Sequence, residues 1–226
     1  MTERVSFRAR DGHTAEGELA LPAGDARVGG LVLLQEWWGV NAHIRDLCER
    51  FAREGFAVLA PDLYDGVTTK DPGEAGQLMT ALKWPVALEK IAGAVAFLKS
   101  HPRCNGRVGV TGFCMGGAGT FVCAAQLEGI AAAVPFYGLA PAHYADWSTA
   151  NTPPIQAHFA ERDQWAKASL AAAVRDALSA RGREMELHVY AADHAFVNDT
   201  RPEVYAPAPA KLALSRATAF LHKHLG

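Results

Sequence analysis

The sequence predicts an α/β fold, a mostly parallel twisted sheet of about seven or eight strands with helices on both faces. Short apolar or β-branched runs alternate with segments of helical character along the chain, as expected when helices connect parallel strands. The chain has 226 residues, half of them hydrophobic, so one large core can form. No linker, repeat or low-complexity tract divides it. We therefore expect a single domain over residues 1–226.

Two antiparallel strands are expected first. Residues 3–9 and 14–21 alternate loosely around Asp11-Gly12, a dipeptide that favours a hairpin turn, and this hairpin should lie at the sheet edge. Later runs of mainly apolar residues predict the other strands: residues 31–34, 56–60, 107–111, 130–136, 155–159 and 185–190.

Helices are expected between these strands. Their apolar or small residues lie in the following segments: residues 44–51, 88–98, 118–126, 167–180 and 214–225. Asn41 can cap the first of them, and His101-Pro102 ends the second. The polar stretch 65–76 contains glycine, so we expect a surface excursion that can carry part of a substrate lid.

Composition excludes several classes of function. The net charge of -2 and the lack of a basic block argue against nucleic-acid binding. No stretch approaches the roughly 18 apolar residues of a membrane span, and the N-terminus lacks a signal-peptide pattern, so a cytoplasmic protein with free thiols is expected. We find no metal-ligand spacing and no phosphate or dinucleotide loop, so no cofactor is expected. The expected partner is a small organic molecule, and the protein is a monomer or a small homo-oligomer.

The segment 112–117 joins a predicted strand directly to a predicted helix. A residue at such an abrupt turn is strained and lies against neighbouring backbone, which explains glycine at Gly112 and Gly116 on either side of Cys114. This pattern is the nucleophile elbow of the α/β-hydrolase fold, with cysteine where serine usually stands. The alternative is an ordinary buried thiol in a closely packed turn.

Two later loops supply the partners that a cysteine nucleophile needs. His194 follows the last predicted strand and can act as base toward Cys114 and then as acid toward the leaving group, although it can also be a surface-loop histidine. Asp163 is our choice to orient the imidazole. Glu161 and Asp193 remain alternatives for that role. The order nucleophile, acid, histidine is the order that this fold uses.

The tetrahedral oxyanion of ester cleavage needs two hydrogen-bond donors. One is expected from the backbone N–H of Met115, the residue after the nucleophile, and the other from the N–H of Trp37, in the loop after the third strand. Trp38 can form an apolar wall of the site or simply pack in the core.

With these residues in view, the chain resembles the dienelactone hydrolase (carboxymethylenebutenolidase) family. The likeness rests on five motifs: Gln35–Asn41, Ala60–Tyr64, Gly112–Gly117, Phe136–Gly138 and His194–Phe196. It implies hydrolysis of an ester or lactone by a triad of Cys114, Asp163 and His194. It also implies that Glu36 holds the thiol unreactive until substrate binds, which is physically sensible because a nearby carboxylate opposes thiolate formation. The side chains we expect at the substrate are Trp38, Tyr64, Lys83, Tyr137, Phe196 and Arg201.

One departure from the family concerns the substrate. The family's dienelactone enzyme binds a substrate carboxylate with two arginines, whereas residues 62–84 here contain no arginine, position 198 is Asn198, and Arg201 is out of register. A single lysine does not reproduce a bidentate arginine clamp. Hydrolysis of another small ester, thioester or amide therefore stays open. So does a non-catalytic thiol sensor or ligand-binding homologue, although the intact Cys114, Asp163 and His194 count against it.

Overall fold

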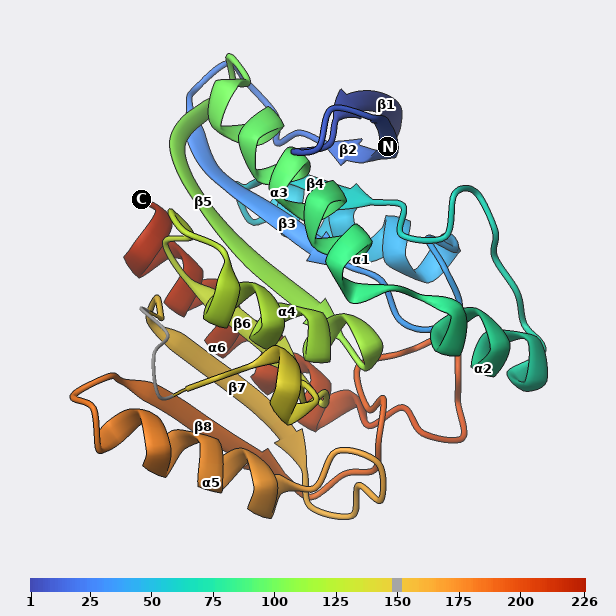
Figure 1. Cartoon of the computed structure of the whole chain (residues 1–226), viewed down its shortest axis with the longest axis vertical. Helices are drawn as coiled ribbons and strands as arrows, with labels where there is room; N and C mark the ends of the chain where they lie inside the picture. Colours follow the sequence, from blue (N-terminus) through green and yellow to red (C-terminus); the bar gives the residue numbers. More distant parts are fainter. Residues whose placement is uncertain (148–151) are drawn as a thin grey trace.

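The computed structural model describes residues 1–147 and 152–226, and an eight-stranded sheet runs through them (Figure 1). The strand order is β1-β2-β4-β3-β5-β6-β7-β8, with antiparallel pairing only at β1, β2 and β4. The strands are β1 Glu3–Arg8, β2 Thr14–Ala20, β3 Val28–Leu34, β4 Ala57–Pro61, β5 Cys104–Phe113, β6 Ala133–Phe136, β7 Ile155–Ala160 and β8 Met185–Tyr190. This is the α/β fold with a mostly parallel sheet that the sequence predicts.

Helices cover both faces of the sheet. They are α1 Ala42–Arg53, α2 Pro72–Ala81, α3 Trp84–Ser100, α4 Met115–Gln126, α5 Ala168–Ser179 and α6 Pro207–Leu225, with a 3-10 turn η1 at Ala142–Tyr144. In Figure 1, α3, α4 and α5 lie in front of the sheet and α1 and α6 behind it. None of the helices within the described ranges is long and apolar enough to cross a membrane.

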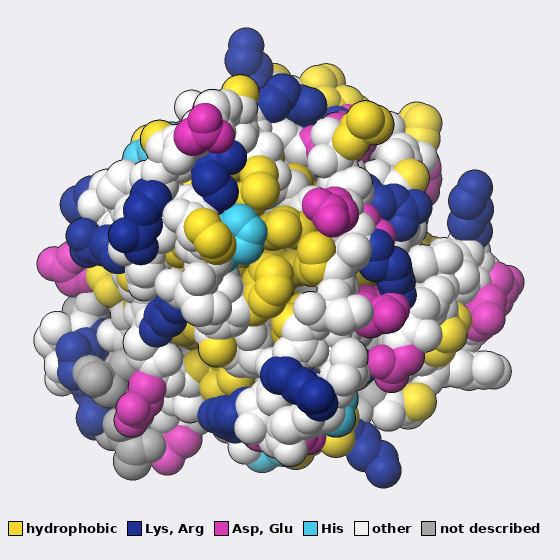
Figure 2. Space-filling view, turned by 90° about the horizontal axis from the view of Figure 1, so that it is seen from above, with side chains coloured by type: hydrophobic (Ala, Val, Ile, Leu, Met, Phe, Trp, Pro, Cys, Tyr) yellow, Lys and Arg dark blue, Asp and Glu magenta, His cyan; other side chains and the backbone are white. Residues whose placement is uncertain are grey.

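The central strand β3 shows why both faces are apolar. Leu31 and Leu33 pack in the cluster that contains α1 and α6, whereas Val32 and Leu34 pack in the cluster that contains α3 and part of α4. Successive side chains of a strand point to opposite faces, so a continuously apolar strand is needed where helices cover both. The surface, by contrast, has mixed charge. Figure 2 shows, on one face, acidic and basic side chains interspersed around an apolar patch.

Several element boundaries differ from those expected, three of them near the site or the expected lid. Residues 65–76 are not wholly irregular, because α2 begins at Pro72 after Asp71, whose Oδ1 accepts from the Glu74 N–H at 2.8 Å. Only Ala75 of this helix is buried, so it carries little apolar periodicity from which it could be predicted. Helix α4 begins at Met115 instead of residue 118. Strand β6 covers only the end of the predicted segment 130–136.

Candidate active site

Cys114 lies at the C-terminal edge of the sheet, between β5 and α4. Its backbone has φ 55° and ψ -114°, a strained conformation for a residue other than glycine. A methyl group at Gly112 would overlap the carbonyl oxygen of Gly116, and one at Gly116 would overlap that of Leu34. The two glycines therefore allow the strand, the turn and the helix to approach closely. The sulfur is partly accessible, unlike the three other cysteines, which are buried.

His194 joins Cys114 and Asp163 in one hydrogen-bonded series. The distance from Nε2 of His194 to Sγ of Cys114 is 3.1 Å, and that from Nδ1 to Oδ2 of Asp163 is 2.7 Å. Asp163 follows β7 and His194 follows β8, whose carboxyl ends are adjacent because these strands pair in parallel. His194 is thereby brought into contact with Cys114, 80 positions away in the sequence, and with Asp163, 31 positions away.

The backbone holds Asp163 in place. Its Oδ1 accepts from the N–H groups of Trp165 and Ala166 at 2.8 and 2.9 Å, so Oδ2 is left for His194. The two alternative carboxylates lie elsewhere. Asp193 forms a bidentate ion pair with Arg162, and Glu161 is exposed. Of the three carboxylates considered, Asp163 is thus the one hydrogen-bonded to His194.

These contacts set the charge of His194. Burial disfavours the imidazolium, but the hydrogen bonds to Asp163 and Cys114 outweigh it and raise the pKa of His194 to about 10. The positively charged imidazolium is thus the favoured form near neutral pH when the thiolate is beside it.

Glu36 is buried close to this series, and its partner is a residue that sequence reasoning did not place in the site. The Nδ2 of Asn198 donates to Oε2 of Glu36 at 2.7 Å, and both residues are almost fully buried. Burial raises the pKa of Glu36 to about 7, although the Asn198 hydrogen bond and the charges of His194 and Arg201 oppose the increase. A protonated Glu36 is therefore well populated near neutral pH.

The two expected oxyanion donors come from the start of α4 and from the turn after β3. Met115 is the first residue of α4, so its N–H is among those without an intrahelical acceptor. Trp37 lies in the turn after β3, in which the N–H of Gly39 donates to the carbonyl of Glu36 at 3.3 Å. Tyr64 is buried, and its hydroxyl lies 3.0 Å from Sδ of Met115, which places it next to the elbow.

One aromatic ring, that of Tyr137, packs against the imidazole. The ring of Tyr137 lies 5.3 Å from those of His194 and Phe196. The ring centroids of Trp38 and Trp37 are 4.9 Å apart, and the guanidinium carbon of Arg201 lies over the Trp38 ring, 5.7 Å from its centroid. Of the expected substrate residues, Tyr137 and Phe196 thus adjoin His194, and Arg201, which acts on Glu36, connects Trp38 to it.

Lys83 is less closely connected to the site. It is exposed at the start of α3 and lines, with Tyr64, a cavity of about 240 Å³ beside α2.

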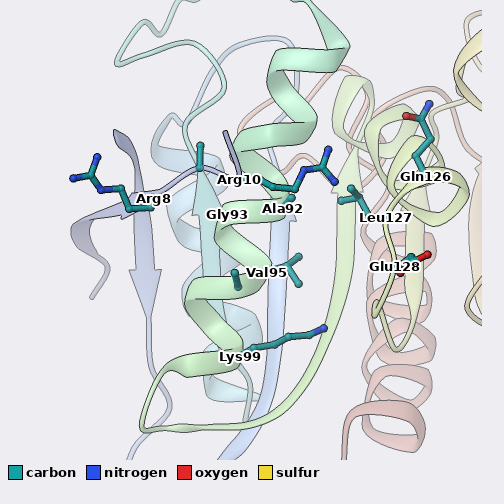
Figure 3. A pocket seen from close by; sticks show the side chains of 11 residues that line it. Arg8, Arg10, Ala92, Gly93, Val95, Lys99, Gln126, Leu127 and Glu128 are labelled. Carbon is teal, nitrogen blue, oxygen red and sulfur yellow. The ribbon is translucent and has the colours of Figure 1, made fainter. Parts of the chain in front are cut away.

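A larger hollow of about 710 Å³ lies between the β1–β2 hairpin, α3 and the C-terminal end of α4, and Figure 3 shows its lining. It reaches α4 at Gln126, the opposite end from Cys114. Size alone therefore does not identify the site.

The sheet order and the strained residue between β5 and α4 define an α/β-hydrolase. The model of the dienelactone hydrolase family matches residues 15–225. The chain belongs to this family and is a carboxylic ester hydrolase.

The relatives match over the whole chain. The protein named usf of Aquifex pyrophilus is 32% identical over 238 residues and covers all of both chains. The carboxymethylenebutenolidase of Pseudomonas putida is 30% identical over 231 residues, which are 98% of this chain and 96% of that protein. The crystal structure titled "Putative Dienelactone Hydrolase" from Klebsiella pneumoniae is 26% identical, with a TM-score of 0.82 and coverage of 96% and 98%.

Proposed function

We propose that this protein hydrolyses an ester or lactone by acyl transfer through Cys114. The observation that carries the proposal is the continuous contact from sulfur to imidazole to carboxylate, at 3.1 and 2.7 Å. His194 serves as base and acid, and Asp163 fixes its orientation and stabilises the imidazolium. The family membership supports the reaction class.

The reaction has two halves. The Cys114 thiolate attacks the acyl carbon, and the N–H groups of Met115 and Trp37 stabilise the oxyanion that forms. The carbon–oxygen bond to the leaving group then breaks, and the His194 imidazolium gives that oxygen its proton. The now neutral imidazole takes a proton from a water molecule, which attacks the acyl carbon of the thioester. The carbon–sulfur bond breaks, the acid leaves, and the imidazolium and thiolate are restored. In a lactone, the leaving oxygen remains part of the product.

The remaining expected residues bind substrate in this proposal. Trp38, Tyr64, Tyr137 and Phe196 provide apolar walls, supported by their burial around His194 and Met115. Arg201 lies over Trp38 at the rim, and Lys83 contributes a charge at the cavity beside α2. Glu36 opposes thiolate formation when it is ionised, as the family resemblance implies.

Replacement of the nucleophile tests the proposal. C114A should lower kcat for small activated esters such as 4-nitrophenyl acetate by about 10³-fold or more, because acyl transfer loses its acceptor. C114S should retain weak activity, since the oxyanion donors survive but the hydroxyl is harder to deprotonate. C123A, which removes a buried sulfur from the same helix, is the matched control and should keep its activity. Full turnover by C114A would refute the proposal, and a panel of lactones, thioesters and amides would define the bond cleaved.

A further inference from the structure

Asn198 fixes one oxygen of Glu36 and leaves the other without a protein partner. Nδ2 of Asn198 donates to Oε2, whereas Oε1 of Glu36 is buried and accepts no hydrogen bond from the described part of the chain. A buried carboxyl group held by one neutral donor is stabilised in its charged form only weakly. The proton of the neutral acid is favoured on Oε1, because Oε2 is occupied as an acceptor.

The orientation of the Asn198 amide is itself fixed. Its Oδ1 accepts from the backbone N–H of Thr200 at 3.1 Å and from the Thr200 hydroxyl at 2.6 Å. A flipped amide would turn Nδ2 toward the backbone N–H of Thr200, so that hydrogen bond would be lost and two donors would face each other. The Thr200 contacts therefore keep the N–H side of Asn198 facing Glu36.

The loop that carries Asn198 is anchored to α1. The next residue, Asp199, forms an ion pair with Arg50, and its Oδ1 lies 3.5 Å from Nδ1 of the buried His43. Arg50 also pairs with Asp46 of the same helix at 2.5 Å. The position of Asn198 is thus set by an ion-pair network outside the catalytic series.

Each cation that acts on Glu36 contacts a carboxylate of its own. The two cations that act on Glu36 are His194, which is hydrogen-bonded to Asp163, and Arg201, whose Nε donates to Glu203 at 2.8 Å. The other ionisable groups facing this point are Cys114 and Tyr137, neither of which supplies positive charge. An incoming carboxylate beside Glu36 would therefore have to compete with Asp163 for His194 and with Glu203 for Arg201.

We propose that Asn198, fixed by Thr200, is a specificity-determining positioning residue that makes the site select acyl groups without a negative charge. As a neutral donor it holds Glu36 in place but does not cancel its charge. An anionic acyl group then meets an ionised Glu36 at higher pH, and at lower pH it must compete with Asp163 and Glu203 for the nearby cations. The inference rests on the proposed function, because it assumes that the acyl group enters beside Cys114.

Alkylation of Cys114 measures this selection without turnover. Iodoacetamide and iodoacetate have nearly the same size, differ in charge, and react alike: the sulfur forms a bond to the CH₂ carbon and iodide leaves. Both require the same thiolate, so the thiolate fraction cancels in the ratio of their rates. Intact-mass analysis can follow the modification, since Cys48, Cys104 and Cys123 are fully buried. The pKa of His194 at about 10 keeps its charge constant between pH 5.5 and 8.5.

In the wild type, the iodoacetamide-to-iodoacetate ratio should rise about tenfold from pH 5.5 to 8.5, as Glu36 ionises with its pKa of about 7. In E36Q the ratio should change less than twofold. N198D places a second carboxyl group against Glu36, and the pair shares one proton, so the ratio should already be high at pH 5.5. A pH-independent ratio in the wild type, or a rise that persists in E36Q, would overturn the proposal.

Thr200 tests the orientation of the amide. T200V removes one of the two donors that hold Oδ1, so the flipped amide becomes accessible. The flipped amide presents its oxygen to Glu36 and favours the protonated carboxyl group. The rise in the iodoacetamide-to-iodoacetate ratio should therefore move to higher pH. T200S retains the hydroxyl and should restore the wild-type profile. Identical profiles for T200V and T200S would show that the hydroxyl does not position Asn198. Failure of the proposed function would appear separately, as ester turnover that persists in C114A.

Discussion

Two histidines of this protein, the buried His158 and the partly buried His194, have both ring nitrogens in hydrogen bonds, but their partners differ. His194 lies between Cys114 and the carboxylate of Asp163. His158, on β7, lies between the hydroxyl of Tyr190 at 2.9 Å and the amide oxygen of Gln156 at 3.1 Å. The pKa of His194 is raised to about 10, whereas burial holds the pKa of His158 well below its ordinary value, with the charges of His188 and Arg216 adding to that effect.

The difference shows that the charge of the partners decides what a buried imidazole can do. Asp163 and the Cys114 thiolate offset the cost of burying a positive charge, whereas a hydroxyl and an amide oxygen do not. His194 can therefore exchange a proton with a reacting group, and His158 stays neutral in the core. The variants below test this comparison, from the largest expected effect to the smallest.

Removing the charge beside His194 should have the largest effect. D163N keeps the shape of the side chain but can favour the wrong tautomer of His194, so kcat should fall by about 10³- to 10⁴-fold. The pKa of His194, followed by NMR, should fall because its negative partner is gone. D193N, which alters the neighbouring carboxylate paired with Arg162, is the matched control. Equal activity of D163N and D193N would contradict the assignment of Asp163.

Removing His158 should affect stability instead. H158L leaves the Tyr190 hydroxyl and the Gln156 amide oxygen without this partner, and we expect the free energy of unfolding to fall by about 3 kcal/mol. The pH dependence should change too. The lowered pKa of His158 means that the wild type loses stability as the pH falls below about 6.5, and H158L lacks this contribution. Urea unfolding at several pH values measures both effects.

Activity per folded molecule provides the control for H158L. In H158L, the rate of Cys114 alkylation should stay within about twofold of the wild-type rate, because His158 forms no hydrogen bond with Cys114 or Asp163. A large loss of alkylation without loss of stability would show that His158 acts on the nucleophile and would end the contrast.

Glu36 extends the comparison to a carboxyl group with a neutral partner. Its pKa of about 7 in the folded chain exceeds the ordinary 4.5, so the stability that the neutral form contributes is complete below pH 4.5 and is lost as the pH rises through 7. E36Q lacks this loss and should be more stable than the wild type by roughly 2 kcal/mol at pH 8. The difference should shrink toward zero near pH 4.5. A difference independent of pH, measured by urea unfolding, would mean that Glu36 does not titrate in this range.

The sheet, the elbow and the proximity of Cys114, His194 and Asp163 could be predicted, because each strand and each loop residue is marked by the residues next to it in the sequence. Buried strands are apolar runs, a strained turn needs glycine, and loops after parallel strands meet at one edge. Asn198 could not be predicted, since its partner Glu36 lies 162 positions away and an asparagine in a loop carries no periodic signal. Lys83 was expected at the substrate because it lies in the stretch where the family carries an arginine, and the structure places it at an exposed helix start.

The smallest expected effect comes from replacing Tyr190. Its hydroxyl is the partner of Nδ1 of His158, as the carboxylate of Asp163 is the partner of Nδ1 of His194. Gln156 donates through Nε2 to Glu186 at 2.6 Å, so its oxygen faces Nε2 of His158, which therefore carries the proton. Nδ1 then accepts from the Tyr190 hydroxyl. Y190F leaves this buried acceptor unpaired and should lower the free energy of unfolding by about 1 kcal/mol, with unchanged ester turnover.

Where D163N changes the reaction, Y190F should change only the stability, although both remove the partner of a histidine Nδ1. Urea unfolding and ester turnover measured on the same preparation would separate the two quantities. The hydroxyl of Tyr190 also lies 3.3 Å from a guanidinium nitrogen of Arg216, which loses this acceptor in Y190F. R216K therefore serves as the control for that contact. If Y190F lowered turnover as strongly as D163N, the charge of the partner would not be what distinguishes the two histidines.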